Sequence, residues 1–121
     1  MKWLRLAAKQ GYAKAQYNLG LIYNIGQGVL QDYKTAVRWY RKAAEQGYAS
    51  GQYNLGSMYV KGWGVIQDNV YAHMWLNMSA SNGHAGALKY RDFMAKEMTA
   101  ADISKAQSLA RACAKKKFKG C

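Results

Sequence analysis

The nine residues NIGQGVLQD, from Asn24 to Asp32, hold the pattern in this sequence that most resembles a site for chemistry. Two glycines flank one residue just ahead of an expected helix, and such a loop can cradle a phosphate with its backbone N–H groups. A dinucleotide-binding loop also needs a preceding strand and a third glycine, but Gln31 stands in the third position and a helix is expected before the loop. A Walker loop needs Lys followed by Ser or Thr, and both are missing. We therefore predict a turn, in which Gly26 and Gly28 give the backbone its freedom and Asp32 caps the next helix.

Other residues able to support catalysis or metal binding are scarce. The two histidines, His73 and His84, have no spacing to Cys113 or Cys121 that makes a zinc site. The six acidic residues form no paired-carboxylate motif. We therefore expect no catalytic residue, no cofactor and no metal ion in this chain, and no enzymatic activity.

The two cysteines suggest a different chemistry. Cys113 and Cys121 are separated by seven residues, and a chain that reverses after a helix ending near Lys115 can bring them together. A bridge over so short a loop would add roughly 2 to 3 kcal/mol in the chain-entropy model, and it would indicate an oxidising compartment such as a bacterial periplasm or the cell exterior. The alternative is two free thiols in a cytoplasmic protein. We favour the bridge, because a cysteine at the last position after a basic run has no evident packing role.

A basic segment, RACAKKKFKGC, ends the chain and contains no acid, while the whole chain carries a formal charge of +12. Its lysines are Lys115, Lys116, Lys117 and Lys119. Such a tail can bind a polyanion or an anionic membrane surface, or it can serve only as a solvated, solubilising end. Only Phe118 interleaves the lysines, so base stacking would be weak and nucleic acid is the less favoured partner.

Composition indicates a folded, helical chain. Half of the 121 residues are hydrophobic, including 4 Trp and 10 Tyr, and no proline is present. Glycine recurs at intervals, which favours helices separated by glycine turns. No run of eighteen apolar residues occurs, so no membrane-spanning segment is expected.

The organisation becomes clear when residues 13–48 are set over residues 49–84, because sixteen of thirty-six positions are identical without a gap. Residues 1–12 match residues 37–48 at seven of twelve positions, so the chain begins inside a repeat unit. Apolar residues within each unit follow helical spacing, and each unit reads as a helix pair. Gly20 and Gly56 fall within the first helix of a pair, where we expect another helix to cross closely. Helix pairs with an excess apolar stripe must stack to bury it, which predicts an all-α superhelix, or solenoid.

The predicted divisions are a partial repeat at 1–12, repeat one at 13–48, repeat two at 49–84, C-terminal capping helices at 85–115 and a basic tail at 116–121. The repeat pattern weakens after Ala85, although helical spacing continues. A helix is expected to begin at Thr99, whose hydroxyl lies three residues ahead of Asp102.

These residues resemble the Sel1-like repeat family, which is related to the tetratricopeptide repeats. The matching positions are Ala15, Leu19, Gly20, Tyr23, Gly26, Gly28, Val29, Asp32, Ala36, Trp39, Tyr40, Ala43, Ala44 and Gly47. Repeat two departs from the pattern at Gly51, Leu76 and Ser79, which are conservative changes in size. The resemblance implies a right-handed α/α superhelix whose concave side binds other proteins, and it implies no shared enzyme activity.

Four residues are candidates for contact with a peptide or protein partner. Asn18 and Asn54 occupy the position where related tetratricopeptide repeats hold a bound peptide backbone, and Lys14 lies one helical turn before Asn18. Trp63 replaces Gln27 in the turn of repeat two, where it can anchor a partner or fold back over its own unit. A solvated polar helix face is the alternative for the other three.

The three remaining tryptophans recur with the period of the repeat. Trp3, Trp39 and Trp75 stand thirty-six residues apart, and we predict that all three pack between units.

Overall fold

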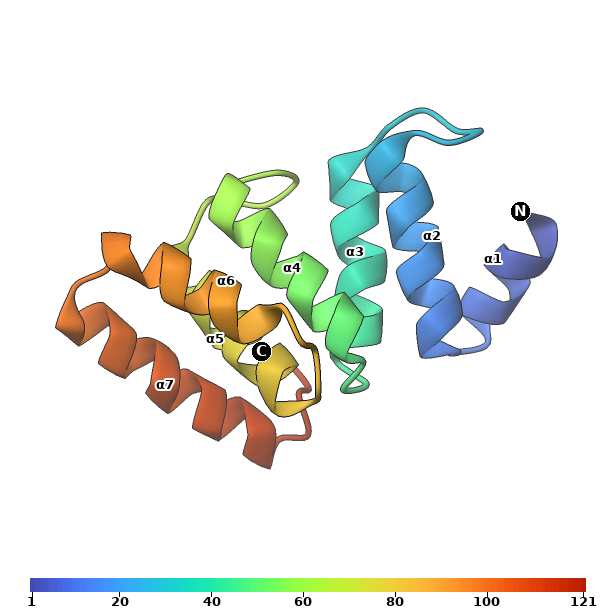
Figure 1. The fold of residues 1–121 in the computed structure, drawn as a ribbon. Coiled ribbons are helices and arrows are strands. Elements are labelled where there is room, and N and C mark those ends of the chain that lie inside the picture. Colours follow the sequence, from blue (N-terminus) through green and yellow to red (C-terminus); the bar gives the residue numbers. More distant parts are fainter.

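The computed structural model describes all of residues 1–121, and every regular element is a helix. The order is α1 (Lys2–Lys9), α2 (Ala13–Ile25), α3 (Tyr33–Ala44), α4 (Ala49–Lys61), α5 (Asn69–Ser81), α6 (Ala87–Met94), the short 3-10 helix η1 (Ala95–Glu97) and α7 (Ala100–Lys115). Figure 1 shows α1 to α5 stacked one after another, with α6 and α7 both packed against α5 at the end opposite α1. The predicted all-α solenoid is confirmed. No helix combines the length and the apolar character needed to cross a bilayer.

Three of the helices, α3, α5 and α7, begin after a residue whose side chain caps them. Asp32 accepts a bond from the backbone N–H of Thr35 (3.2 Å) and a second from the Thr35 hydroxyl (2.8 Å). Asp68 accepts from two backbone N–H groups in the first turn of α5. The Thr99 hydroxyl accepts from the N–H of Asp102 (3.1 Å) at the start of α7. Each bond donated by a backbone N–H satisfies an amide that has no partner inside its helix.

The loop between α2 and α3 is a turn, as predicted. Gly26 ends α2 with φ +81°, and Gly28 has φ +76°, so both adopt the left-handed conformation that side chains disfavour. A helix precedes this loop, whereas a dinucleotide-binding loop follows a strand.

Close crossing of helices explains the glycine in the middle of α2. A Cβ atom at Gly20 would lie 2.6 Å from the ring of Tyr40 and 3.3 Å from the carbonyl oxygen of Ala36, both on α3. A Cβ at the equivalent Gly56 would lie 3.0 Å from the Leu76 side chain on α5. The predicted close approach is confirmed, and a side chain of the second helix fills the space left by each glycine.

Neighbouring units are also tied together by a buried polar bond that recurs with the repeat. The amide Nε2 of Gln16 donates to the carbonyl oxygen of Ala8 (3.1 Å), and Nε2 of Gln52 donates to that of Ala44 (3.1 Å). Both glutamines are buried. Each of these carbonyl oxygens lies at the C-terminal end of the preceding helix and also accepts a backbone N–H, from Gly11 (3.1 Å) and from Gly47 (3.0 Å) respectively, so the glutamine amide makes the second bond to that oxygen.

The main core lies between α3, α4, α5 and α7, with Tyr40 and Trp75 fully buried in it. Trp39 packs against a smaller cluster made by residues of α1 and α2. The prediction for Trp3 was wrong, because its side chain is 80% exposed. Trp39 has the two preceding helices to pack on, whereas no helix of this chain covers the outer face of α1.

A buried histidine makes stability depend on pH. His73 stands where repeat one has Val37, is 3% exposed, and leaves its Nδ1 without a hydrogen-bond partner. Burial lowers its pKa, the positive charge of Arg91 lowers it further, and Asp92 acts weakly in the opposite direction. The neutral form is therefore favoured in the folded chain. The unfolded chain takes up the proton more readily, so stability is present above a pH of about 6.5 and falls as the pH drops below it.

We expect His73→Val, which restores the residue of repeat one, to weaken this dependence. Urea denaturation at several values between about pH 8 and about pH 5 should show the midpoint of the wild type falling more steeply than that of the variant. Equal slopes for the two proteins would show that another group is responsible.

Candidate functional site

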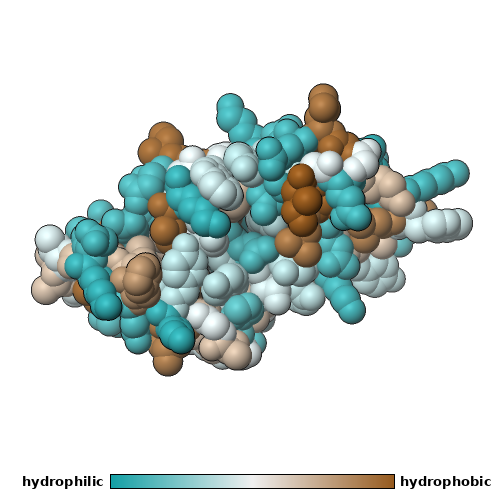
Figure 2. Space-filling model, turned by 45° about the horizontal axis from the view of Figure 1, so that its top comes forward, coloured by the Kyte–Doolittle hydropathy of each residue, from teal (hydrophilic) through white to brown (hydrophobic).

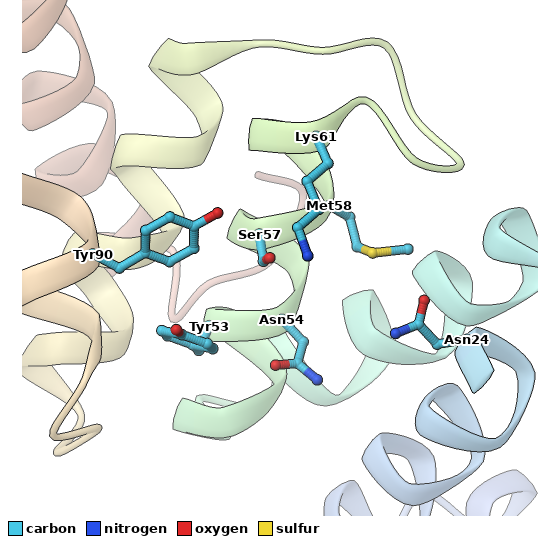
Figure 3. A pocket seen from close by; sticks show the side chains of 7 residues that line it. All are labelled: Asn24, Tyr53, Asn54, Ser57, Met58, Lys61 and Tyr90. Atoms are coloured by element: carbon cyan, nitrogen blue, oxygen red, sulfur yellow. The ribbon is translucent and has the colours of Figure 1, made fainter. Parts of the chain in front are cut away.

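A polar pocket of about 390 Å³ opens between α2, α4 and α6, which are the first helices of successive pairs. Figure 3 shows the side chains that line it. They are Asn24 from α2, Tyr53, Asn54, Ser57, Met58 and Lys61 from α4, and Tyr90 from α6. We refer to this pocket as the groove. It is formed by three helices that are distant in sequence and adjacent only through stacking of the units.

Most of the groove lining comes from one face of α4. Asn54, Ser57 and Lys61 are spaced three and four residues apart, which places them one above another on a helix. The Tyr90 hydroxyl points toward them from α6 (Figure 3). The Tyr53 ring is held between its neighbours, stacked on His84 with 4.2 Å between ring centroids and tilted against Tyr90 at 5.7 Å. The lining thus combines hydrogen-bond donors with an aromatic wall, and it contains no acidic side chain.

Two buried polar atoms near the groove lack hydrogen-bond partners. They are Oδ1 of Asn24 and the hydroxyl of Tyr40. Burial raises the pKa of Tyr40 to about 12, while the nearby amides of Asn54 and Asn24 act in the opposite direction without making a bond of good geometry. The pKa of Tyr17 is also raised, mainly by burial and then by Tyr48. Both phenols are therefore neutral at physiological pH. The Tyr40 hydroxyl and Oδ1 of Asn24 remain without hydrogen-bond partners beside Asn54.

The structure separates the four residues predicted to contact a partner. Asn54 lines the groove. Lys14 and Asn18 lie on α2, exposed and half-buried respectively, but outside this pocket. The binding role of all three stays a prediction.

Trp63 lies over its neighbouring unit. Its ring stacks on Tyr33, at the start of α3, with 4.8 Å between centroids and 8° between planes. The ammonium of Lys61 lies 4.5 Å from the centroid of the Trp63 ring. The indole remains 39% exposed. Trp63 therefore joins the turn of repeat two to repeat one and also contacts a groove lysine.

The predicted disulfide between Cys113 and Cys121 is present, with the Cα atoms 5.8 Å apart. It folds residues 116–121 back against the turn between α3 and α4, so the C terminus lies in the middle of the molecule (Figure 1). The N–H of Gly120 donates to the Glu45 carboxylate (3.2 Å), and the Phe118 ring covers Gly47. The four tail lysines are exposed on this closed segment.

The face seen in Figure 2 has no continuous hydrophobic patch that could serve as a second binding site. Hydrophobic residues there form separate spots with hydrophilic residues between them. Leu30 and Ile66, which are equivalent in the two repeats, are each 90% exposed at the loop tips. Singly exposed apolar residues are normal on a protein surface. A more apolar pocket of about 510 Å³ lies on the other side of Tyr90 and includes Phe93 and Glu97.

Sequence reasoning missed six lining residues, which are Asn24, Tyr53, Ser57, Met58, Lys61 and Tyr90. A signal existed for two of them, because Ser57 and Lys61 replace Leu21 and Ile25 of repeat one. A polar residue in one repeat at a position that is apolar in the other repeat indicates that this helix face has a more polar environment in the first of them. Tyr90 had no such signal, because it lies after the recognisable repeats. The structure brings no three His, Cys, Asp or Glu side chains together in a way that could hold a metal ion.

Fold and groove together define a class, the α-solenoid proteins built from stacked helix pairs. The chain matches the Sel1 repeat family over residues 1–12, 13–48 and 49–84. It belongs to the Sel1 repeat family, whose members generally serve as protein-interaction scaffolds.

Two solved structures support this assignment. One is c5321, described as a protective antigen present in uropathogenic Escherichia coli strains and displaying an SLR fold, with a TM-score of 0.91 and 34% identity over 97% of this chain. This chain spans 26% of that protein's length. The other is a Sel1 repeat protein from Oxalobacter formigenes, with a TM-score of 0.74 and 41% identity over 75% of this chain and 68% of that one. No curated protein matches the chain.

Proposed function

We propose that this chain is a non-catalytic interaction module that binds a peptide or protein segment in the groove between α2, α4 and α6. The observation that supports this most directly is a polar pocket of about 390 Å³ on the first-helix face, with Asn54 at its centre. An asparagine amide offers one donor group and one acceptor, which suits the backbone of an extended peptide. The aromatic rings of Tyr53 and Tyr90 offer apolar surface to the side chains of the same segment.

Replacing Asn54 with alanine tests this proposal. We expect the partner affinity to fall roughly five- to tenfold, which corresponds to the loss of one or two hydrogen bonds to the ligand. The partner is first captured from source cells with the wild-type chain, and its affinity is then measured by calorimetry for wild type and variants.

Gln107→Ala is the matched control, because it removes an amide from the exposed side of α7. It should leave the affinity unchanged. Asn18→Ala measures whether the contact extends along α2 beyond the pocket. If wild type and Asn54→Ala bind the partner with equal affinity and have equal melting temperatures, the groove is not the binding site.

Binding of a polyanion or an anionic membrane surface by the basic tail stays the alternative. Its support is the exposure of Lys115, Lys116, Lys117 and Lys119 on a segment that the disulfide holds in place. Of the four, Lys116 alone lines one of the described pockets, a mostly apolar one of about 200 Å³, so the lysines together offer charge without a shared geometry for a particular anion. We therefore rank this function below groove binding.

We also propose that the chain works in an oxidising compartment, either a bacterial periplasm or the cell exterior. The support is the Cys113–Cys121 bond, because such bonds persist where thiols are not kept reduced.

A further inference from the structure

The groove has one charged lining residue, and it is a cation. Lys61 stands at the C-terminal end of α4, and Figure 3 shows its ammonium directed back along the helix toward Ser57 and Asn54. The inference that follows rests on the proposed function of the groove and concerns the chemistry of the segment that binds there.

No carboxylate of the chain pairs with Lys61. The chain has 6 acidic and 18 basic side chains, and its one ion pair joins Arg91 to Asp92 (2.8 Å). Asp32 and Asp68 are engaged at helix starts, and Glu45 accepts the N–H of Gly120. The Lys61 ammonium therefore lacks a counter-charge within the protein.

The groove around this ammonium is rich in further donors. The Ser57 hydroxyl, the Asn54 amide and the Tyr90 hydroxyl all line the same pocket and can each donate a hydrogen bond. Because no acidic side chain lines it, an anion entering the groove meets donors and no side chain of like charge. Bonds from a charged donor to a carboxylate are stronger than those between neutral groups.

The lysine is also held in position before any ligand arrives. Its ammonium lies over the face of Trp63, and Trp63 in turn stacks on Tyr33 of repeat one. A cation placed over an aromatic ring loses part of its rotational freedom in advance, which lowers the entropy cost of binding. This arrangement occurs only in repeat two, because Ile25 replaces Lys61 and Gln27 replaces Trp63 in repeat one.

We propose that the groove selects a peptide segment carrying a carboxylate, which is bound by the Lys61 ammonium with the Ser57 hydroxyl and the Asn54 amide. The rings of Tyr53 and Tyr90 contact the apolar part of the segment. Lys61 is thereby the residue that determines specificity, and Trp63 positions it. The carboxylate belongs either to an acidic side chain or to the C-terminal end of the segment.

Three synthetic peptides distinguish these sources. The first, acetyl-Ala-Leu-Glu-Leu-Ala-amide, carries a single side-chain carboxylate. The second has Gln in place of Glu and carries no charge. The third is the Gln peptide with a free C terminus. Titration of the labelled chain, followed through amide resonances of Asn54, Ser57 and Tyr90, gives the affinity at the groove itself.

We expect a carboxylate peptide to bind roughly tenfold more tightly than the uncharged one, with the advantage falling as salt is added. Lys61→Gln should abolish the preference, and Lys61→Arg, which keeps the charge, should retain it. The matched control Lys105→Gln, on the exposed side of α7, should retain it fully. Preference for the first peptide identifies an acidic side chain as the ligand, and preference for the third identifies a C-terminal carboxylate.

Failure of this inference is distinguishable from failure of the proposed function. Equal binding of all three peptides at the groove, or an equal loss for all of them in Lys61→Gln, would overturn carboxylate selection and leave peptide binding in place. If none of the peptides shifts the groove resonances at millimolar concentration, both the selection and the groove function are overturned.

Discussion

Gly64→Ala is expected to lower the free energy of unfolding by about 2 to 4 kcal/mol, through steric conflict between the two repeats and an unfavourable backbone conformation. A Cβ at Gly64 would lie 2.5 Å from the carbonyl oxygen of Tyr33 and 2.9 Å from the nitrogen of Lys34. These are backbone atoms at the start of α3, so they cannot rotate away as a side-chain end can. The loop would have to separate from α3, and the stack of Trp63 on Tyr33 would separate with it.

The equivalent glycine of repeat one supplies a matched control. Gly28 has φ +76°, close to the +74° of Gly64, but a Cβ there would have no atom within 4 Å. Gly28→Ala should therefore cost only the backbone conformational term, about 1 kcal/mol. Urea denaturation of the two variants measures the difference. If they are equally destabilised, contact between the repeats contributes nothing at this position.

Cys121→Ser is expected to lower the free energy of unfolding by about 2 to 3 kcal/mol, because it opens a short loop that the disulfide closes. The partner Cys113 is buried, so substitution at Cys121 avoids placing a hydroxyl in the core. Loss of the bond should also free the Phe118 ring from the main core and from Gly47. Lys117 and Phe118 have φ +54° and +68°, a conformation that non-glycine residues adopt only when their surroundings hold them there.

Reduction provides the control for this prediction. Reductant should lower the thermal midpoint of the wild type to that of Cys121→Ser and leave the variant unchanged. Hydrogen exchange at residues 116–121 should become faster in both reduced and variant chains. A wild-type midpoint that does not respond to reductant, with the bond shown to be broken, would mean that the tail is held by packing alone.

Much of the fold could be predicted because it depends on local chemistry that recurs. The repeat period is visible in the sequence itself, and the turn at Gly26 and Gly28 and the caps at Asp32 and Thr99 follow from residues near one another in sequence. Helix ends are set by unsatisfied N–H and C=O groups, and such groups find the nearest suitable partner. These features are therefore determined by neighbouring residues in the sequence and do not depend on how the helices pack.

The candidate site was predictable only in part. Asn54 was found by its place in a repeated helix, but its neighbour Tyr90 comes from α6, which carries no repeat signal. For Trp3 the periodicity predicted burial where there is none. Trp3 and Trp39 occupy equivalent positions in their units, but Trp3 is exposed and Trp39 packs against α1 and α2. A period reports where a residue sits within its unit, and it cannot report which other unit lies against it.

The sequence by itself determined that this chain is a stack of helix pairs with glycine turns, capped helices and a cysteine pair within reach of each other. Only the tertiary structure decided that Lys61 enters a pocket with no carboxylate, that Trp63 holds it from a neighbouring loop, and that the tail returns to Glu45. The physical reason is one of range. Capping and helical periodicity act within about one turn of chain, whereas the partners of a groove residue come from helices tens of residues away and meet only when the units stack.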